Sequence, residues 1–469
     1  MVKTRFSPSP TGMLHLGNAR AALFSALYAK KEQGIFLLRI EDTDVSRSDE
    51  KYIDILQNDL IWLGLHWQEG PGKDGGNGPY WQSHRQKIYD SYYQQLETQN
   101  RAYPCFCTEQ ELAIHRKLQQ SRGQPPRYSG LCRKLTKEQI AARLVAGEKP
   151  ALRFLVPEHA VIEFMDLVKG SQHFKSDYIG DFIIRRADGT SSFMFCNAID
   201  DSLMGVTHVI RGEDHLTNTP RQLMILQALG LRTAQYGHLS LITGDDGAPL
   251  SKRHGSFSLH DLREQGYLPI AVANYLARLS HAYDEQKLMD FSELAQRFQL
   301  EKISRASARF DKNQLLHWQK EVVMAMDAAS CWQWIGEDIK NTIPYASQGL
   351  FIELAKNNFL FPEEIKQFAT ILFGEKLHHT EDNIAILKST SKDLLTKVLE
   401  GIEQYDTDFP SLLNFLKSEV GLTGKQLYMP IRIALTGEQH GPELAKIAVL
   451  LGKERLKERF HSALLLLGK

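Results

Sequence analysis

Two loops far apart in the sequence carry residues that could bind the phosphates of a nucleotide. The first, residues 8–18, places two prolines and Gly12 ahead of a helical pattern, with His15 and Gly17 where the helix begins. A helix start offers backbone N–H groups and a positive dipole end to an anion, glycine permits close approach, and imidazole donates without a fixed charge. A histidine two residues before a glycine is common by chance, so this loop alone is equally typical of a surface turn.

The second loop, residues 250–255, reads Leu-Ser-Lys-Arg-His-Gly. Its Lys252 and Arg253, next to Gly255, could neutralise charge that develops on a transferring phosphate. Alone, such a triplet is more often a solvated face. The two loops together with the acidic strand end at residues 39–44 are unlikely to occur in this order by chance, and no Walker A loop competes with them. We therefore predict an ATP site built from both loops.

The segments around these loops predict an α/β fold that ends in a helical region. Residues 4–7 and 35–40 are strand-like and residues 17–31 helical, which is a β-α-β order and implies parallel strands. The pattern is interrupted over residues 103–174 and resumes near residues 181–185 and 206–211. Beyond residue 310 helical periodicity dominates, and we expect a helix packed on its own domain from apolar residues spaced three and four apart, Leu456, Phe460, Ala463, Leu464 and Leu467.

Composition indicates a multidomain globular protein. The chain has 469 residues, more than one hydrophobic core usually serves, with 42% hydrophobic and 24% charged residues. No apolar run approaches the roughly 20 residues of a membrane span, the first residues lack the apolar core of a secretory signal, and the five cysteines are too few for a disulfide framework. We expect a reduced, cytoplasmic protein without membrane contact.

The balance of 56 acidic and 56 basic residues hides a local basic segment. Only Glu109 and Glu111 oppose the basic residues between positions 101 and 134, which are Arg101, Arg116, Lys117, Arg122, Arg127, Arg133 and Lys134. Screening limits each charge to a range of roughly 10 Å, so a patch binds phosphate whatever the total charge. The segment is therefore a candidate surface for a polyanion.

Three cysteines in the same region are candidate zinc ligands. Cys105 and Cys107 flank Phe106, and Cys132 follows on another turn-like segment. Zinc prefers four thiolate or nitrogen ligands in a tetrahedral array, and His115 is a local candidate for the fourth. The alternative is three reduced structural cysteines without a metal.

The chain resembles the class I aminoacyl-tRNA synthetases, and within them the bacterial glutamyl-tRNA synthetases, over essentially its full length. The sequence His-Leu-Gly-Asn at residues 15–18 stands at the HIGH motif of that family, and residues 250–254 stand at its KMSKS motif. The resemblance continues through residues 200–201, 205–214, 218–222 and 430–437.

The resemblance implies an α/β, Rossmann-type class I catalytic domain with an α+β acceptor-binding insertion, followed by an all-α anticodon-binding domain. The implied divisions are residues 1–102, the first half of the catalytic domain; 103–180, the acceptor-stem-binding insertion with the candidate zinc site; 181–238, the second catalytic half; 239–310, a stem-contact domain with the KMSKS-like loop; and 311–469, the helical anticodon-binding domain.

The implied activity is glutamate–tRNA ligation. L-Glutamate reacts with ATP and its Mg²⁺ to give glutamyl-adenylate, and the glutamyl group then passes to the 3′ end of tRNA-Glu; charging of tRNA-Gln as well stays open, and a monomer is implied. The alternative is a catalytically weak, tRNA-binding paralogue. A glutaminyl enzyme would end in β-barrel domains, and a truncated relative would lack the helical third.

The resemblance also assigns site residues. The residues carried over for catalysis are His15, Gly17, Ser251, Lys252 and Arg253. Those for ATP binding are Pro8, Thr11, Gly12, His15, Gly17, Asn18 and Lys252. Those for glutamate binding are Arg5, Ser7, Ser9, Glu41, Phe193, Asn197 and Arg211. Guanidinium groups bind carboxylates bidentately, so Arg5 and Arg211 suit a dicarboxylate, although Arg5 could instead pair with Glu41 or Asp42.

The sequence departs from the family pattern in three places. Phe193 replaces the usual tyrosine, which removes a hydroxyl near the glutamate side chain, and Pro249 replaces a lysine at the start of the KMSKS loop. Lys134 stands where some relatives have a zinc-binding histidine. Tyr128 matches a tyrosine ligand of a shorter related enzyme, so the implied metal set is Cys105, Cys107, Tyr128 and Cys132, with Zn²⁺ in a structural role.

Overall fold

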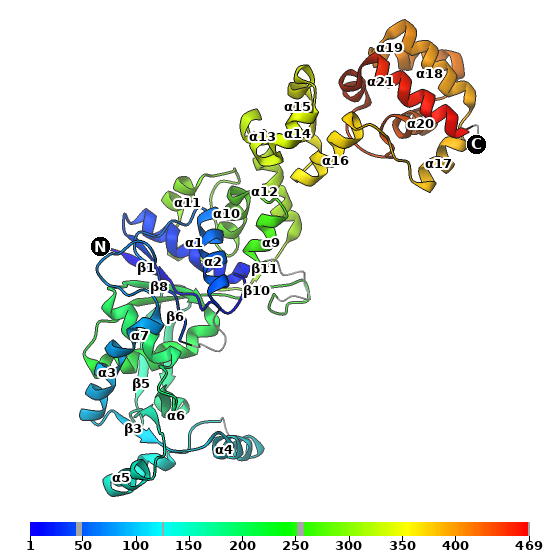
Figure 1. The fold of residues 1–469 in the computed structure, drawn as a ribbon. Coiled ribbons are helices and arrows are strands. Elements are labelled where there is room, and N and C mark those ends of the chain that lie inside the picture. The colour runs from blue at the N-terminus through cyan, green and yellow to red at the C-terminus, as the bar shows by residue number, and fades with distance from the viewer. Residues whose placement is uncertain (44–48, 124–125, 251–257, 468–469) are drawn as a thin grey trace. The chain divides into compact units, whose positions relative to one another are not determined.

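The computed structural model describes residues 1–43, 49–123, 126–250 and 258–467, which form two compact units. Unit 1 comprises Met1–Glu264 and Leu268–Trp318, and unit 2 comprises Gln265–Tyr267 and Gln319–Lys469. All the β-sheets of the described chain lie in unit 1, whereas the described part of unit 2 is helical (Figure 1).

The main sheet of unit 1 has six strands among the described residues. Their spatial order is β2 (Ile35–Leu38), β1 (Lys3–Phe6), β8 (His208–Gly212), β9 (Gln235–Leu239), β5 (Val161–Asp166) and β6 (Gly170–Lys175). Neighbours are parallel except β5 and β6. Because helix α1 (Leu16–Lys31) connects β1 to β2, the expected β-α-β unit is confirmed, and the buried apolar run of β2 is typical of a sheet covered on both faces.

Two smaller sheets complete unit 1. Strands β3 (Ala102–Cys105), β4 (Ala151–Phe154) and β7 (Phe182–Arg185) are antiparallel, and β10 (Ile242–Thr243) pairs with β11 (Ala308–Arg309). These sheets do not follow the divisions expected at residues 103 and 181. Strands β5 and β6 of the expected insertion extend the main sheet, whereas β7, from the expected second catalytic half, pairs with β4 of the insertion. The sequence gives little sign of this exchange because β5 joins β9 through a single residue pair, Asp166 with Tyr236.

Helices surround these sheets. The remaining helices of unit 1 are α2 (Glu50–Trp62), α3 (Gln86–Thr98), α4 (Glu109–Ser121), α5 (Lys137–Val145), α6 (Ser176–Ile179), α7 (Phe193–Leu203), α8 (Thr219–Leu229), α9 (Leu259–Glu264), α10 (Pro269–Arg278) and α11 (Phe291–Arg297), with short 3-10 turns η1 (Gln82–Arg85), η2 (Leu131–Lys134), η3 (Glu213–Asn218) and η5 (Leu300–Lys302). Helices α3, α7 and α8 share one apolar core, in which the rings of Tyr93 and Phe195 stack at 4.3 Å. This core fixes α7, which carries several polar residues of the site described below.

The helical character expected after residue 310 is confirmed. The helices are α12 (Lys312–Ala325), which spans the boundary between the units, α13 (Ala328–Ile335), α14 (Glu337–Thr342), α15 (Gln348–Asn358), α16 (Pro362–Phe373), α17 (Glu381–Lys388), α18 (Lys392–Tyr405), α19 (Phe409–Val420), α20 (Gly424–Thr436) and α21 (Leu444–Leu467), with the turn η6 (Tyr345–Ser347). Leu456, Phe460 and Ala463 of α21 are buried in the core, and Leu464 and Leu467 pack against it. None of the described helices is long and apolar enough to cross a membrane.

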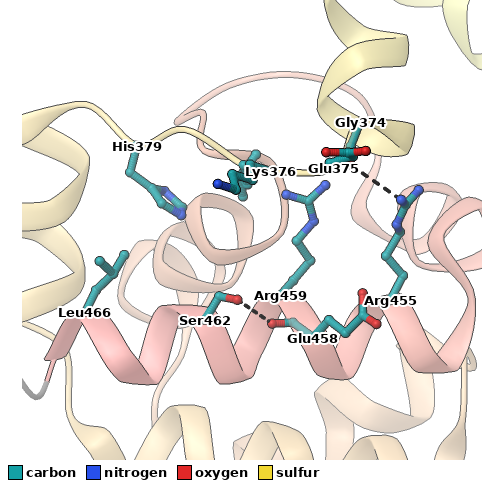
Figure 2. A pocket seen from close by; sticks show the side chains of 10 residues that line it. Gly374, Glu375, Lys376, His379, Arg455, Glu458, Arg459, Ser462 and Leu466 are labelled. Carbon is teal, nitrogen blue, oxygen red and sulfur yellow. Dashed lines mark hydrogen bonds between the residues drawn. The ribbon is translucent and has the colours of Figure 1, made fainter.

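Two arginines of α21 border a cavity of about 450 Å³ in unit 2 (Figure 2). Arg455 donates from Nη1 to the carbonyl of Leu372 at 3.0 Å, and Arg459 donates from Nη2 to that of Ile371 at 2.7 Å. Both carbonyls belong to the last turn of α16, where cations stabilise the negative end of a helix dipole. These guanidinium groups therefore hold α21 against the end of α16.

Candidate active site

A buried cluster of charges lies where β1 and β2 end. Asp201 of α7 accepts hydrogen bonds from Nε of Arg5 at 3.2 Å and faces Nη1 of Arg39 at 2.8 Å, while Nη2 of Arg39 donates to Oε1 of Glu41 at 3.1 Å. Burial raises the pKa of Asp201, but the two guanidinium groups outweigh it and hold that pKa below its ordinary value. The partner of Arg5 is thus Asp201; neither Glu41 nor Asp42 forms an ion pair with it among the described residues.

The neighbouring Asp200 points to a different set of partners. Its carboxylate accepts from Nε of Arg85 at 2.7 Å, from the hydroxyl of Tyr89 at 2.7 Å and from Nε2 of Gln82 at 2.9 Å. These residues belong to η1 and α3, so Asp200 joins α7 to the segment of residues 82–98. The acidic pair therefore fixes α7 on two sides, and Asp201 is the member that faces the site.

A chain of side-chain hydrogen bonds connects Glu41 to Arg211. Nδ2 of Asn197 donates to Oε1 of Glu41, Nε2 of Gln222 donates to Oδ1 of Asn197 at 2.9 Å, and Nη2 of Arg211 donates to Oε1 of Gln222 at 2.7 Å. Burial raises the pKa of Glu41, and the charges of Arg39 and Arg5 only partly offset it. Three residues expected to bind glutamate, Glu41, Asn197 and Arg211, are thus placed in one network.

Arg211 is a buried cation without an anionic partner in the described part of the chain. Its side chain is bonded to neutral acceptors, which are Gln222, Oγ1 of Thr219 at 2.9 Å and Nε2 of His238 at 3.2 Å, while its Nη1 has no hydrogen-bond partner among the described atoms. Burial and the nearby charge of Arg5 lower the pKa of Arg211 to about 10. The negative charges of Asp201 and Glu41 offset these effects only in part. A buried cation without an ion pair is costly, so this guanidinium could bind a carboxylate supplied by a ligand.

The first loop brings His15 to the start of α1. Nδ1 of His15 accepts from the backbone N–H of Asn18 at 3.4 Å, which leaves the proton of a neutral imidazole on Nε2 as a donor. Desolvation lowers the pKa of His15 despite the charge of Asp214, which favours the neutral form. The backbone N–H of Glu41 donates to the carbonyl of Pro8 at 3.0 Å, so this loop is tied to the other strand end.

The other residues predicted in this loop differ in exposure. Ser9, Thr11, His15 and Asn18 are exposed, Ser7, Gly12 and Gly17 are intermediate, and Pro8 is buried. The hydroxyl oxygen of Ser7 is buried and has no hydrogen-bond partner among the described atoms. The exposed side chains are accessible to a ligand at the start of α1.

Gly17 accommodates the imidazole of His15, and this gives a testable consequence. A Cβ at position 17 would stand 3.1 Å from Cε1 and 3.2 Å from Nδ1 of His15. We expect Gly17→Ala to displace the ring and to lower kcat/KM for ATP roughly 10- to 100-fold, in line with the loss of one aligned donor. Alanine is the better helix former by up to about 1 kcal/mol, so the melting temperature should not fall.

Steady-state kinetics and thermal unfolding of the same preparations check this prediction. Gly349→Ala in α15 is the matched control, because a Cβ there meets no atom within 4 Å. It should leave the KM for ATP unchanged. A Gly17→Ala variant with normal ATP kinetics would show that the imidazole position is unimportant.

Three residues predicted for catalysis, Ser251, Lys252 and Arg253, lie outside the described residues. The structure describes the residues on either side of this segment, up to Leu250 and from Ser258. The backbone N–H of Leu250 donates to the carbonyl of Ile242 at 2.9 Å, and Pro249 bridges to Thr243. On the other side Ser258 forms a bridge with His15. Ser258, three residues beyond the second loop, is therefore a direct neighbour of the first loop.

Phe193, which replaces the usual tyrosine, is the first residue of α7. Its ring lies 5.2 Å from that of His215, measured between centroids. Burial and the charge of Arg211 lower the pKa of His215 to about 4, so this imidazole is neutral near pH 7. The phenyl ring of Phe193 and the neutral imidazole of His215 therefore bring no further charge close to Arg211.

The three cysteines of the predicted metal set lie together. The sulfur atoms of Cys105, Cys107 and Cys132 are all within 4.8 Å of one another. The hydroxyl oxygen of Tyr128 lies 3.5 Å from Sγ of both Cys105 and Cys107. Burial raises the pKa of Cys105, but hydrogen bonds from Tyr128 and Arg153 outweigh it and keep that pKa below its ordinary value. These cysteines form a group that could hold a metal ion.

The sequence matches two family models that together span nearly the whole chain. Residues 1–317 match tRNA synthetases class I (E and Q), catalytic domain, and residues 315–464 match an anticodon binding domain. The chain belongs to the class I tRNA synthetases of the E and Q group. This match confirms the resemblance inferred from the two loops. It also confirms the expected order, in which an α/β catalytic domain is followed by an all-α anticodon-binding domain.

Known proteins similar to this synthetase agree with the match. It is 52% identical over 463 residues to glutamate–tRNA ligase 2 of Coxiella burnetii (strain RSA 331 / Henzerling II), with 99% of this chain and 100% of that protein covered. It is 49% identical to glutamate–tRNA ligase 2 of Nitrosococcus oceani, with 98% of each covered. The crystal structure of a glutamate tRNA ligase from Elizabethkingia meningosepticum in complex with its amino acid superposes with a TM-score of 0.86 at 29% identity and covers 99% of each chain.

Several residues that organise the site of this synthetase were not predicted as site residues. Asp201 and Arg39 neutralise the charges around Arg5 and Glu41, and His238 and Gln222 support Arg211. An adjacent pair of carboxylates inside the apolar run of α7 was a usable signal, because buried carboxylates require cationic partners. A single histidine on β9 gave none.

Proposed function

We propose that this chain is a glutamate–tRNA ligase, which activates L-glutamate with Mg-ATP and transfers the glutamyl group to the 3′ end of tRNA-Glu. The observation that carries the choice of amino acid is Arg211, whose buried guanidinium lacks an anionic partner within the described chain. A carboxylate side chain would supply the missing charge, whereas an uncharged carboxamide would not. The name shared by the similar proteins supports the same activity.

In this proposal the residues act by positioning and by charge stabilisation. Arg211 and Arg5 bind the carboxylates of glutamate, and Glu41 supplies the opposite charge for its ammonium group. His15 donates from Nε2 to a phosphate oxygen of ATP, and Lys252 neutralises charge that builds during transfer. The α-carboxylate of glutamate attacks the α-phosphate, pyrophosphate leaves, and the ribose hydroxyl of the tRNA then displaces AMP. Little acid–base chemistry is needed, because alignment of the reactants supplies most of the rate enhancement.

The direct test is an aminoacylation assay with purified protein, radiolabelled glutamate, Mg-ATP and tRNA-Glu. We expect charging with glutamate and none with glutamine, and parallel reactions with tRNA-Gln measure the breadth of tRNA specificity. Absence of charging, or charging with glutamine in place of glutamate, would refute the proposal.

Basic residues on the segment from Arg101 to Lys134 support a role in tRNA binding for the insertion. Arg116 and Lys117 on α4, together with Arg122, Arg127 and Arg133, are exposed. We propose that this surface, within the division at residues 103–180, contacts the phosphates of the acceptor stem, and that the helical part after residue 311 binds the anticodon. A loss of tRNA affinity in an Arg116→Ala, Lys117→Ala variant, with glutamate affinity unchanged, would support the first assignment.

We also propose a structural zinc ion bound by Cys105, Cys107, Cys132 and Tyr128. The donor set fits, because three sulfur atoms and a phenolic oxygen converge from β3, the loop after β3, η2 and the loop before η2. His115 is not a member of the group that the three cysteines form among the described residues. Zinc would hold these segments together, and no step of the ligation depends on it.

Metal analysis checks the zinc proposal. We expect about one equivalent of zinc per chain after purification without chelators, and Cys107→Ser should lose it because a serine hydroxyl is a poor replacement for a thiolate. Cys331→Ala is the control, since this buried cysteine belongs to the core of unit 2. Less than ~0.2 equivalents of zinc in the unaltered protein would defeat the proposal.

A further inference from the structure

Three neighbouring strands of the main sheet place Arg211 beside a buried histidine–aspartate pair. Arg211 on β8 is directly opposite His238 on β9 in the parallel register, and Asp166 ends β5 next to β9. Nδ1 of His238 lies 2.5 Å from Oδ2 of Asp166, and both side chains are fully buried. Arg211 is thus backed by residues from two further strands.

The hydrogen bonds around His238 determine which ring nitrogen carries the proton. Asp166 also accepts from the backbone N–H groups of Val168 and Lys169, at 2.9 and 2.8 Å, so it is held as an acceptor. It therefore accepts a hydrogen bond from Nδ1–H of His238, and the ring carries its proton on Nδ1. Nε2 of His238 is left as an acceptor for Nε of Arg211 at 3.2 Å, and the hydroxyl oxygen of Thr219 lies 3.1 Å from the same nitrogen. If Nε2 of His238 carried a proton, two N–H groups would face each other and Arg211 could not donate to this nitrogen.

This support orients Arg211 without neutralising it. Arg5, the other arginine predicted to bind glutamate, is held by the carboxylate of Asp201, which cancels much of its charge. Arg211 is held by an imidazole, an amide oxygen and a hydroxyl, all uncharged. The carboxylate of Asp166 is separated from Arg211 by the imidazole ring. The two guanidinium groups are therefore similar in burial but differ in the charge left for a ligand.

We propose that His238 and Asp166 are positioning residues that fix the guanidinium of Arg211 through a neutral acceptor and so reserve its charge for the carboxylate of the amino acid. The assignment rests on the proposed function. It explains why a histidine, rather than an acidic residue, stands opposite Arg211. An acidic side chain there would make an equally good hydrogen bond but would compete with the substrate for the same charge.

Three substitutions of His238 in the full-length protein separate orientation from charge. His238→Gln retains a neutral acceptor for Arg211 and a donor for Asp166, so the KM for glutamate should stay within about threefold of the unaltered value. His238→Ala removes both and should raise that KM about 10- to 100-fold. His238→Glu places a carboxylate against Arg211 and should raise it further than His238→Gln does. Asp166→Asn should fall between His238→Gln and His238→Ala.

The readouts are the KM for glutamate and for ATP in aminoacylation, equilibrium dialysis of radiolabelled glutamate, and the melting temperature. In folded variants the KM for ATP should change less than about twofold, since the support acts on one substrate. The matched control is His208→Gln, because His208 lies on β8, the strand of Arg211, but bonds to Thr207 and Tyr28. This control should leave both constants unchanged.

Different outcomes overturn different claims. If His238→Ala retains the unaltered glutamate KM, or if His238→Glu binds glutamate as well as His238→Gln, the positioning assignment is wrong while the ligase activity stands. If glutamate and ATP constants rise together, the pair is merely structural. If the unaltered protein neither binds glutamate nor charges tRNA with it, the proposed function fails and this assignment fails with it.

Discussion

Substitution of Arg211 by alanine is expected to abolish most glutamate recognition while leaving ATP binding intact. In the complex it would strand a substrate carboxylate in a buried site, a loss of about 3–5 kcal/mol, which corresponds to a rise in the KM for glutamate of roughly 100-fold or more. In the free protein the same change removes a guanidinium without an ion-pair partner among the described residues. The melting temperature should therefore change far less than the glutamate KM.

Paired variants make this test specific. Arg211→Lys keeps the charge but loses the forked geometry, so it should recover only part of the affinity. Arg278→Ala removes a half-buried arginine that stacks on Trp318 at 4.1 Å, away from the polar network, and should lower stability without changing the KM for glutamate. An Arg211→Ala enzyme with an unchanged glutamate KM would remove the main support for glutamate as the amino acid.

The local elements around the first loop were predictable because local patterns determine them. The strand and helix expected at residues 4–7 and 17–31 are observed at Lys3–Phe6 and Leu16–Lys31. The exchange of strands between sheets was not predictable. It depends on the single pairing of Asp166 with Tyr236, and pairing between distant segments leaves no periodicity in either of them.

The candidate site also has a part that the sequence predicts and a part that it does not. Arg5, Glu41 and Arg211 were predicted from motifs, and the structure brings them to neighbouring strand ends. What sequence could not give is how each charge is compensated, since Asp201, His238 and Asp166 come from segments more than 150 residues away from Arg5. The structure adds this difference, because Arg5 forms an ion pair with Asp201 whereas Arg211 forms none among the described residues.

Replacement of Asp201 by asparagine is expected to destabilise unit 1 strongly. The change keeps the size of the side chain but leaves Arg5 and Arg39 facing each other around an uncharged amide, and breaking a buried ion pair by removing one partner costs about 3–5 kcal/mol. Urea unfolding followed by circular dichroism measures the loss. Asp54→Asn on the exposed face of α2 is the matched control and should have a much smaller effect.

The pH dependence of this loss distinguishes an ion pair from a packing defect. The guanidinium groups hold the pKa of Asp201 below its ordinary value in the folded protein, so its stabilising contribution is complete above the unfolded-state pKa and disappears as pH falls through the folded-state pKa. The difference in unfolding free energy between the unaltered protein and Asp201→Asn should therefore be largest near pH 7 and shrink as the solution is acidified below about pH 4. A difference that stays constant over this range would mean that asparagine disturbs packing, and that Arg5 does not depend on Asp201 for its charge balance.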